Sequence, residues 1–303
     1  MGEAAIEVRG LRKSYGDLEA VKGIDLSVAE GEVFALLGPN GAGKTTTVEI
    51  LEGFRGRTSG DVSVLGHDPA KAGAEFRARI GIVLQSTGVD PYLTVRETVE
   101  LYGGYYPNPR PADEVIEVVG LAEKRDTRVV KLSGGQQRRL DVAIALAGDP
   151  ELLFLDEPTT GFDPGARRNA WEMVRNLKAL GKTVIQTTHY MDEAQHLADR
   201  VAVIAKGEIV AEGPPTTLGD RHLADAAIRF RLPAAAELPP ELAGRVIETA
   251  DGYELIVPDA TRALHDLTGW ALGHGMELEG LHVSQPTLED VYLELTGGEA
   301  GQE

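Results

Sequence analysis

A glycine-rich loop between a buried strand and a helix constrains the fold of this chain more than any other segment. The five residues from Val33 to Leu37 are all apolar, as in a central strand that is covered on both faces. The loop follows at once and reads Gly38-Pro39-Asn40-Gly41-Ala42-Gly43-Lys44-Thr45-Thr46. Helical spacing of apolar residues resumes from Lys44 to Phe54. We therefore expect strand, loop and helix in this order.

The loop fits the phosphate-binding pattern G-x-x-x-x-G-K-[ST]. Its glycines let successive backbone N–H groups point toward phosphates, and the helix N-terminus adds partial positive charge. We expect Lys44 to reach the β- and γ-phosphates of a nucleotide and the Thr45 hydroxyl to ligate Mg²⁺. A glycine-rich turn that precedes Lys-Thr by chance is the alternative. The flanking strand and helix supply the context that the motif requires, and they favour phosphate binding.

A second apolar strand ends in two carboxylates. Leu152 to Leu155 are apolar, and Asp156 and Glu157 follow them directly. Asp156 suits a water-mediated contact with Mg²⁺, and Glu157 suits polarisation of the attacking water. A solvated strand end is the alternative explanation of this segment alone. The phosphate-binding loop elsewhere in the chain makes a catalytic role the better interpretation.

The alternation of strands and helices predicts a doubly wound α/β core. Further strands are predicted at residues 6–8, 24–28, 183–187 and 200–205. Helices are predicted at residues 112–119, 134–147 and 165–180. Thr94 and Glu97 have the spacing of a capping box that opens one more helix.

A proline-rich break at Gly213-Pro214-Pro215 predicts a domain boundary. We expect one domain over residues 1–215 and a small α+β domain over residues 216–303. The second domain has predicted strands at 228–232, 245–249, 253–257 and 277–282, and a helix at 259–272. A last helix is predicted after Pro286, where Thr287 and Asp290 are spaced as a capping box.

Composition excludes several classes of function. The chain has 303 residues and no cysteine, which rules out disulfides, zinc–thiolate sites, iron–sulfur clusters and thiol nucleophiles. Its formal net charge of −18 repels phosphate backbones at long range, so we expect no nucleic-acid partner. The acidity is concentrated toward the C-terminus. No apolar run approaches the length of a membrane span, and we expect a soluble chain inside the cell.

The pentapeptide Leu132-Ser133-Gly134-Gly135-Gln136 resembles the signature motif of ABC (ATP-binding cassette) ATPases. From the residues alone, it is a serine N-cap and two glycines that open a helix, which is an anion-binding arrangement. The resemblance implies that it binds the γ-phosphate of ATP held by another subunit. It also implies a P-loop NTPase fold with a RecA-like core, an antiparallel β subdomain and a helical subdomain, followed by the small C-terminal domain.

Other positions match motifs of the same family in the family's order. Tyr15 resembles the aromatic residue that stacks on adenine, although a lone tyrosine near a strand end is more often a packing residue. Gln85 resembles the Q-loop glutamine that contacts Mg²⁺ and the transport partner. Gly161-Phe162-Asp163 resembles the D-loop, with phenylalanine where leucine is more usual. His189 resembles the switch histidine that senses the γ-phosphate.

The resemblance implies an ATPase that uses ATP and Mg²⁺ and works as a homodimer. Lys44, Glu157 and His189 would be its catalytic residues. One phosphate loop and one signature motif are present, so a complete site needs two copies arranged head to tail. In this family a separate membrane permease contacts the Q-loop and the residues after it, here 86–106. Core packing explains some of those residues as well. Such a partner would hold the chain at the inner face of the cell membrane.

The segments 160–168 and 283–297 resemble the drug-resistance exporter branch, of which daunorubicin-resistance ATPases are an example. The second segment also fits a plain amphipathic helix, because Leu288, Val291, Tyr292 and Leu295 share one face. An importer ATPase is the nearest rival, but its C-terminal extension is usually longer. A soluble ABC protein acting on ribosomes or DNA is disfavoured by the charge. A module that binds ATP without hydrolysing it is disfavoured by Glu157.

Overall fold

The computed structural model describes residues 4–83, 88–218, 225–233, 246–249 and 252–284, together with Leu288 and Tyr292. Its contacts divide the chain into two compact units, which meet in the sequence between Pro215 and Thr216. Each unit has its own hydrophobic core. Among the described residues, no helix combines the length and the apolar character that crossing a bilayer requires.

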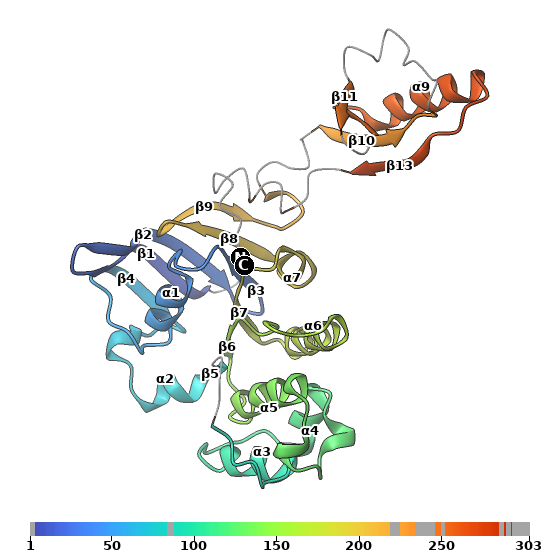
Figure 1. Ribbon diagram of the computed structural model, residues 1–303. Helices are drawn as coiled ribbons and strands as arrows, with labels where there is room; N and C mark the ends of the chain where they lie inside the picture. Colours follow the sequence, from blue (N-terminus) through green and yellow to red (C-terminus); the bar gives the residue numbers. More distant parts are fainter. Residues whose placement is uncertain are drawn as a thin grey trace. The chain divides into compact units, whose positions relative to one another are not determined.

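A six-stranded sheet forms the centre of the first unit (Figure 1). Its strand order is β5-β6-β7-β3-β8-β9, and every pair is parallel except β8 with β9. The strands are β3 (Val33–Leu37), β5 (Ile80–Val83), β6 (Leu152–Asp156), β7 (Thr183–Thr188), β8 (Arg200–Ala205) and β9 (Glu208–Gly213). All residues of β3 and β7 are buried, as the apolar run predicts for central strands.

An antiparallel sheet of order β2-β1-β4 covers one face of the central sheet. Its strands are β1 (Ala4–Tyr15), β2 (Leu18–Ala29) and β4 (Ser59–Val64). Residues Ile6, Leu26 and Val64 share a core with Phe34 of β3 and with α1 (Lys44–Leu51). The strands predicted at 6–8 and 24–28 are present but longer, because bulges interrupt the alternation on which the prediction rested.

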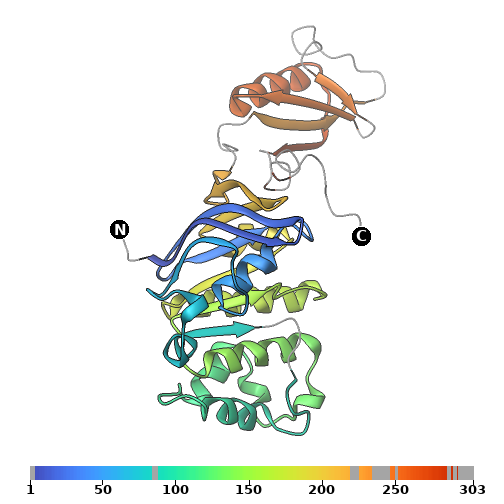
Figure 2. The same ribbon diagram turned by 90° about the vertical axis from the view of Figure 1, so that its left-hand side faces the viewer.

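Helices cover the other face and form a helical subdomain. α6 (Pro164–Ala179) packs on the central sheet, where Met173 and Leu177 join its core. The remaining helices of this face and subdomain are α3 (Val95–Gly103), α4 (Ala112–Val118), α5 (Gly134–Leu146) and α7 (Met191–Leu197), with 3₁₀ turns at Ala122–Lys124 and Val129–Lys131. The helix α2 (Ala74–Arg79) instead adds Phe76 to the core shared with the antiparallel sheet, and a 3₁₀ turn at Pro69–Lys71 precedes it. Figure 2 shows the green α3–α5 together at one end of this unit. The capping box predicted at Thr94 and Glu97 is confirmed.

The second unit is a four-stranded antiparallel sheet with one helix. The strand order is β11-β12-β10-β13, and the elements are β10 (Ala226–Arg231), β11 (Val246–Thr249), β12 (Gly252–Val257), α9 (Ala260–Gly273) and β13 (Glu279–Ser284). Ile228, Leu255 and Leu267 form its core. These elements confirm the predicted α+β pattern. The helix predicted after Pro286, with Thr287 and Asp290, lies outside the described residues.

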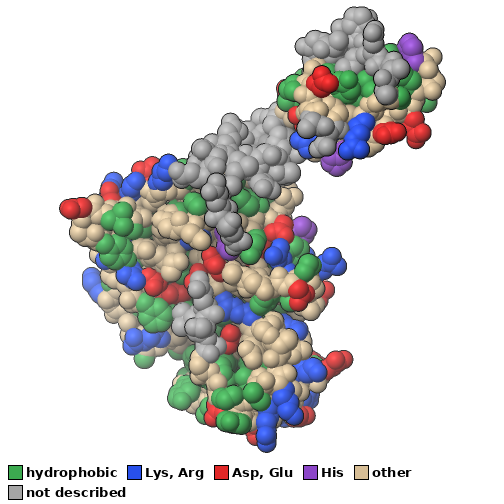
Figure 3. Space-filling view, viewed as in Figure 1, with side chains coloured by type: hydrophobic (Ala, Val, Ile, Leu, Met, Phe, Trp, Pro, Cys, Tyr) green, Lys and Arg blue, Asp and Glu red, His purple; other side chains and the backbone are tan. Residues whose placement is uncertain are grey.

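The surface of the first unit carries charges of both signs. On the face drawn in Figure 3, Lys and Arg side chains are interspersed with Asp and Glu. Several charged side chains of this unit form ion pairs, including Arg79 with Glu151 and Arg110 with Asp149. Mixed charge of this kind keeps a surface soluble without creating a strong field of one sign.

Candidate active site

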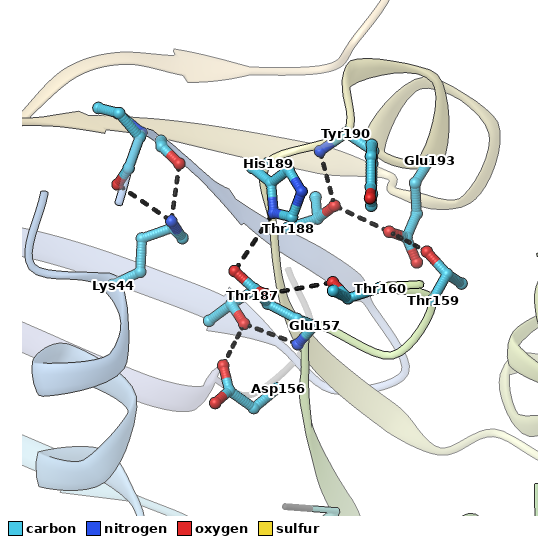
Figure 4. Close-up of polar contacts among 12 residues, drawn as sticks. Lys44, Asp156, Glu157, Thr159, Thr160, Thr187, Thr188, His189, Tyr190 and Glu193 are labelled. Carbon is cyan, nitrogen blue, oxygen red and sulfur yellow. Dashed lines mark hydrogen bonds and ion pairs between the residues drawn. The ribbon is translucent and has the colours of Figure 1, made fainter. Parts of the chain in front are cut away.

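The carboxyl ends of three neighbouring strands bring the predicted catalytic residues together. β6, β7 and β3 are adjacent and parallel, so the loops that follow them leave the sheet at the same edge. These loops carry the Asp156–Glu157 pair, His189 and the glycine loop before Lys44, which Figure 4 shows in one cluster. Ligand sites of α/β proteins lie at this edge of the sheet.

Steric limits explain the glycines of the phosphate-binding loop. A Cβ on Gly38 would lie 2.3 Å from the carbonyl oxygen of Ile204, which no side chain tolerates. Gly43 has φ +108°, and a Cβ there would lie 2.6 Å from the carbonyl oxygen of Ala20. Gly43 is also the N-cap of α1, so the helix begins directly where the loop ends. The sequence motif thus corresponds to a backbone that only glycine permits.

Lys44 is buried against this loop. Its ammonium Nζ donates to the carbonyl oxygens of Gly38 at 2.7 Å and Pro39 at 3.1 Å (Figure 4). Burial lowers the pKa of Lys44, and the nearby carboxylates of Glu157 and Asp156 act in the opposite direction. An ammonium has three protons, so one remains for an anionic ligand.

Glu157 is the most constrained carboxylate of the cluster. Its Oε2 accepts from the Thr160 hydroxyl at 3.1 Å, and its Oε1 lies 3.3 Å from Nδ1 of His189. The residue has φ +43°, in the left-handed region that side chains other than glycine rarely adopt. Such strain is characteristic of functional positions, because the surrounding structure must hold it in place. Among the described residues, Glu157 therefore has the geometry of an oriented base.

Thr187 fixes the backbone between Asp156 and Glu157. Its hydroxyl donates to Oδ1 of Asp156 at 2.5 Å and accepts from the backbone N–H of Glu157 at 3.0 Å. Asp156 and Thr187 are also direct partners in the β6–β7 register. Residue spacing in the sequence does not predict this role of Thr187. The signal is a polar residue one position before the end of β7, a strand whose residues are all buried.

The oxygen atoms at this site fit Mg²⁺, although no cluster of three or more Asp, Glu or His residues among the described residues could hold a metal by itself. Thr45 is exposed, and its hydroxyl has no internal partner in the described part of the chain. The Oδ1 atom of Asp156 accepts the hydrogen bond from Thr187, so Oδ2 is left as the metal-binding oxygen. Mg²⁺ commonly combines one or two protein oxygens with waters and substrate phosphates, which agrees with so small a donor set.

The signature segment opens α5 as predicted. Ser133 is the N-cap of this helix and forms a capping box with Gln136. The side-chain oxygen of each residue accepts from the backbone N–H of the other. A hollow of about 890 Å³ lies beside it. Its lining includes Ser133, Gly134 and Gly135 on one side and Glu157, Gly161 and Asp163 on the other. The glycine loop before Lys44 is not part of this lining.

Three further predicted residues have other surroundings. Tyr15 ends β1, is 40% exposed, and has the cations of Lys13 and Arg55 at 4.9 and 5.4 Å from its ring centre. Asp163 caps α6, because its Oδ1 accepts from the N–H groups of the first helical turn. Gln85, predicted as a Mg²⁺ contact, lies outside the described residues. The nucleotide contacts of Tyr15 and Asp163 stay predictions.

Known proteins resemble the chain over nearly its whole length. Residues 21–160 match the ABC transporter family, and residues 226–287 match the C-terminal domain of ABC transporter domain-containing proteins. Daunorubicin resistance ATP-binding protein DrrA3 of Streptomyces coeruleorubidus is 41% identical, over 98% of this chain and 97% of that protein. Nod factor export ATP-binding protein I of Paraburkholderia xenovorans is also 41% identical, over 99% of both chains. The chain therefore belongs to the ABC transporter family, as an ATP-binding protein.

Solved structures of ATP-binding cassettes share the fold of the first unit. The cbiO1 subunit from Clostridium perfringens, part of an ABC transporter complex, aligns with a TM-score of 0.65 at 28% identity. That alignment covers 71% of this chain and 90% of cbiO1. A dimeric post-hydrolysis cassette bound to ADP and phosphate, MJ0796, aligns with a TM-score of 0.60 at 27% identity, over 69% of this chain and 98% of MJ0796. The predicted ABC cassette fold is confirmed.

Proposed function

We propose that this protein binds ATP with Mg²⁺ and hydrolyses it to drive export through a separate membrane permease. The observation that carries the proposal is the oriented Glu157 carboxylate, which Thr160 and His189 hold in place. It lies at the edge of the sheet where the parallel strands end and where Lys44 also lies. Relatives that span the whole chain are ATP-binding proteins of drug resistance and Nod factor export. They favour an exporter of a drug or of a lipid- or polysaccharide-like molecule.

Each polar group has a distinct task in phosphoryl transfer. Lys44 and the loop N–H groups stabilise the negative charge of the phosphates, and Glu157 accepts a hydrogen bond from the attacking water and orients it. His189, bonded to Glu157 through Nδ1, leaves Nε2 for the γ-phosphate. Mg²⁺, held by Thr45, Asp156 and Gln85, would supply further neutralisation of phosphate charge. Little covalent chemistry is required of the protein.

A head-to-tail homodimer would complete the site. Ser133, Gly134, Gly135 and Gln136 present the N-terminus of a 13-residue helix, which suits a phosphate, whereas Lys44 belongs to a different loop. A second copy would bring its signature segment to the phosphates held by the first, and Asp163 would lie at the contact. The dimeric state of the related cassette MJ0796 supports this assembly.

The permease is proposed to bind near Gln85 and residues 86–106. Tyr92, Leu101 and Tyr105 in this stretch are 73%, 52% and 77% exposed, so core packing does not account for these three side chains. Apolar side chains exposed in one segment are typical of a partner surface. A membrane-bound partner would place the protein at the inner face of the cell membrane. Residues 1–215 would then act as the ATPase domain and 216–303 as an accessory domain.

The Glu157→Gln variant tests the proposal directly. It keeps the shape of the side chain but cannot act as a base, so ATP turnover should fall at least ~100-fold while ATP binding persists. Size-exclusion chromatography with ATP and Mg²⁺ should show a stable dimer of the variant. Glu208→Gln, an exposed position on β9, serves as the matched control. Wild-type turnover in Glu157→Gln would refute the base assignment, and absence of turnover in the wild type would favour an ATP-gated binding module.

A further inference from the structure

A buried carboxylate on α7 joins the two loops that carry Glu157 and His189. Glu193 is 1% exposed. One of its oxygens, Oε2, accepts from the Thr159 hydroxyl at 3.0 Å and from the Thr188 hydroxyl at 2.8 Å (Figure 4). Thr159 lies two residues after Glu157, and Thr188 directly precedes His189. A single oxygen atom therefore links both catalytic loops.

The hydrogen bonds continue from Glu193 into both loops. The Thr188 hydroxyl, which donates to Glu193, also accepts from the backbone N–H of Tyr190 at 3.0 Å. On the other side, the carbonyl oxygen of Thr159 accepts from the N–H of Phe162 at 3.1 Å. The link thus extends from the residue after His189 to the loop segment that is proposed to face a second subunit.

Fold stability alone gives a poor account of an acid at this position. Burial raises the pKa of Glu193 to about 7, and the two threonine hydroxyls act in the opposite direction. Asp192 raises the pKa further, and Arg167 lowers it. A buried carboxylate costs desolvation free energy that an apolar side chain of similar volume avoids. Its other oxygen, Oε1, has no hydrogen-bond partner among the described residues.

We propose that Glu193 is a positioning residue for ATP hydrolysis. By holding Thr159 and Thr188 on one oxygen, it sets the spacing of the two loops. That spacing decides whether Glu157 and His189 reach the same water and phosphate. The hydrogen bonds to Oε2 of Glu193 come from Thr159 and Thr188 and not from Glu157 or His189, so Glu193 acts through the threonines. The inference rests on the proposed function, because it requires hydrolysis at Glu157.

Valine substitutions of the two threonines test the link in the full-length chain at pH 8, where Glu193 is largely ionised. Thr159→Val and Thr188→Val keep the side-chain volume and remove one hydroxyl each. We expect each to lower kcat about tenfold, because small displacements of catalytic groups have large effects on rate. KM for ATP should change less than about twofold, since Lys44 and its loop are untouched. The double variant should be no slower than the slower single variant, because the groups act as one unit.

Substitutions of Glu193 itself separate geometry from charge. Glu193→Gln retains an oxygen acceptor of the same shape, and it should keep at least about a third of the wild-type kcat. Glu193→Ala should lose at least about tenfold. The matched control is Thr183→Val at the other end of β7, where a buried hydroxyl accepts from the backbone N–H of Gly31 at 3.0 Å. This control should lose stability but keep kcat.

The outcomes distinguish this inference from the proposed function. Folded valine variants with a kcat within about twofold of wild type would overturn the positioning role. So would fully multiplicative effects in the double variant, or a Glu193→Gln variant as slow as Glu193→Ala. If Glu193→Ala does not fold, the valine variants decide. A wild-type chain that hydrolyses no ATP would overturn the proposed function, and this inference with it.

Discussion

Replacing Glu52 by glutamine is expected to stabilise the protein, by an amount that grows with pH. Glu52 directly follows α1 and is 7% exposed. Its side chain lines a hollow of about 330 Å³ together with Phe54, Arg77 and Tyr105. Within the described part of the chain, neither a hydrogen bond nor an ion pair reaches its carboxyl group. A carboxylate in this position is poorly solvated and uncompensated.

The magnitude follows from the pKa. Burial raises the pKa of Glu52 from 4.5 to about 8, and the charges of Asp156 and Glu49 act in the same direction. Below pH 4.5 the carboxyl is protonated in both the folded and the unfolded chain. Between pH 4.5 and 8, the folded protein keeps a proton that the unfolded chain has released. The free energy of unfolding therefore falls by about 1.4 kcal/mol per pH unit in this range. Over the whole range the fall approaches roughly 5 kcal/mol. Glutamine does not titrate and avoids this loss.

Urea unfolding at pH 5 and pH 8 measures the effect. In a Trp270→Phe background, the fluorescence of Trp171 reports the first unit alone. The advantage of Glu52→Gln should be about 1 kcal/mol or less at pH 5 and about 3–5 kcal/mol at pH 8. Glu208→Gln, at an exposed position on β9, should show no such pH dependence. An equal advantage of Glu52→Gln at both pH values would show that burial does not hold the proton on Glu52.

Three further predictions concern the loop, a helix cap and the domain division. Lys44→Ala should weaken ATP binding about ten- to a hundredfold, measured by calorimetry, because a charged hydrogen-bond donor to the phosphates is lost; an unchanged Kd would contradict its assignment. Asp163→Ala should lower the free energy of unfolding by about 1 kcal/mol in urea, because the α6 cap is removed. Removal of residues 216–303 should leave one cooperative calorimetric transition, because both cores of the first unit end before Pro215; loss of that transition would show that the second unit completes the first.

The sequence predicts which candidate site residues lie together because Glu157 and His189 follow directly on buried strands. Once Leu152–Asp156 and Thr183–Thr188 are neighbours in a parallel sheet, Glu157 and His189 must leave the same edge. The capping box at Ser133 and Gln136 is likewise local, so spacing alone identifies it. Local chemistry of this kind is legible from residue type and order.

Other features depend on contacts that sequence spacing does not encode. Glu193 bonds Thr159 across 34 positions, and only the packing of α7 brings them together. The strand β9 was also not predicted. Its signal was the pair Lys206-Gly207, whose φ values of +50° and +87° form a tight hairpin turn. Along Glu208–Gly213, exposed residues alternate with partly buried ones, as they do in a strand at the edge of a sheet. This pattern differs from the wholly apolar run that identifies a central strand in the sequence.

The position of β3 in the middle of the central sheet has a consequence for synthesis on the ribosome. Its neighbours β7 and β8 are made some 150 residues later. Closing so long a loop delays strand pairing, because its entropic cost precedes the contacts. The glycine loop before Lys44 packs against Ile204, so it gains its final shape only after β8 has emerged. A nascent chain should therefore acquire nucleotide affinity late and abruptly, when almost the entire first unit has been translated.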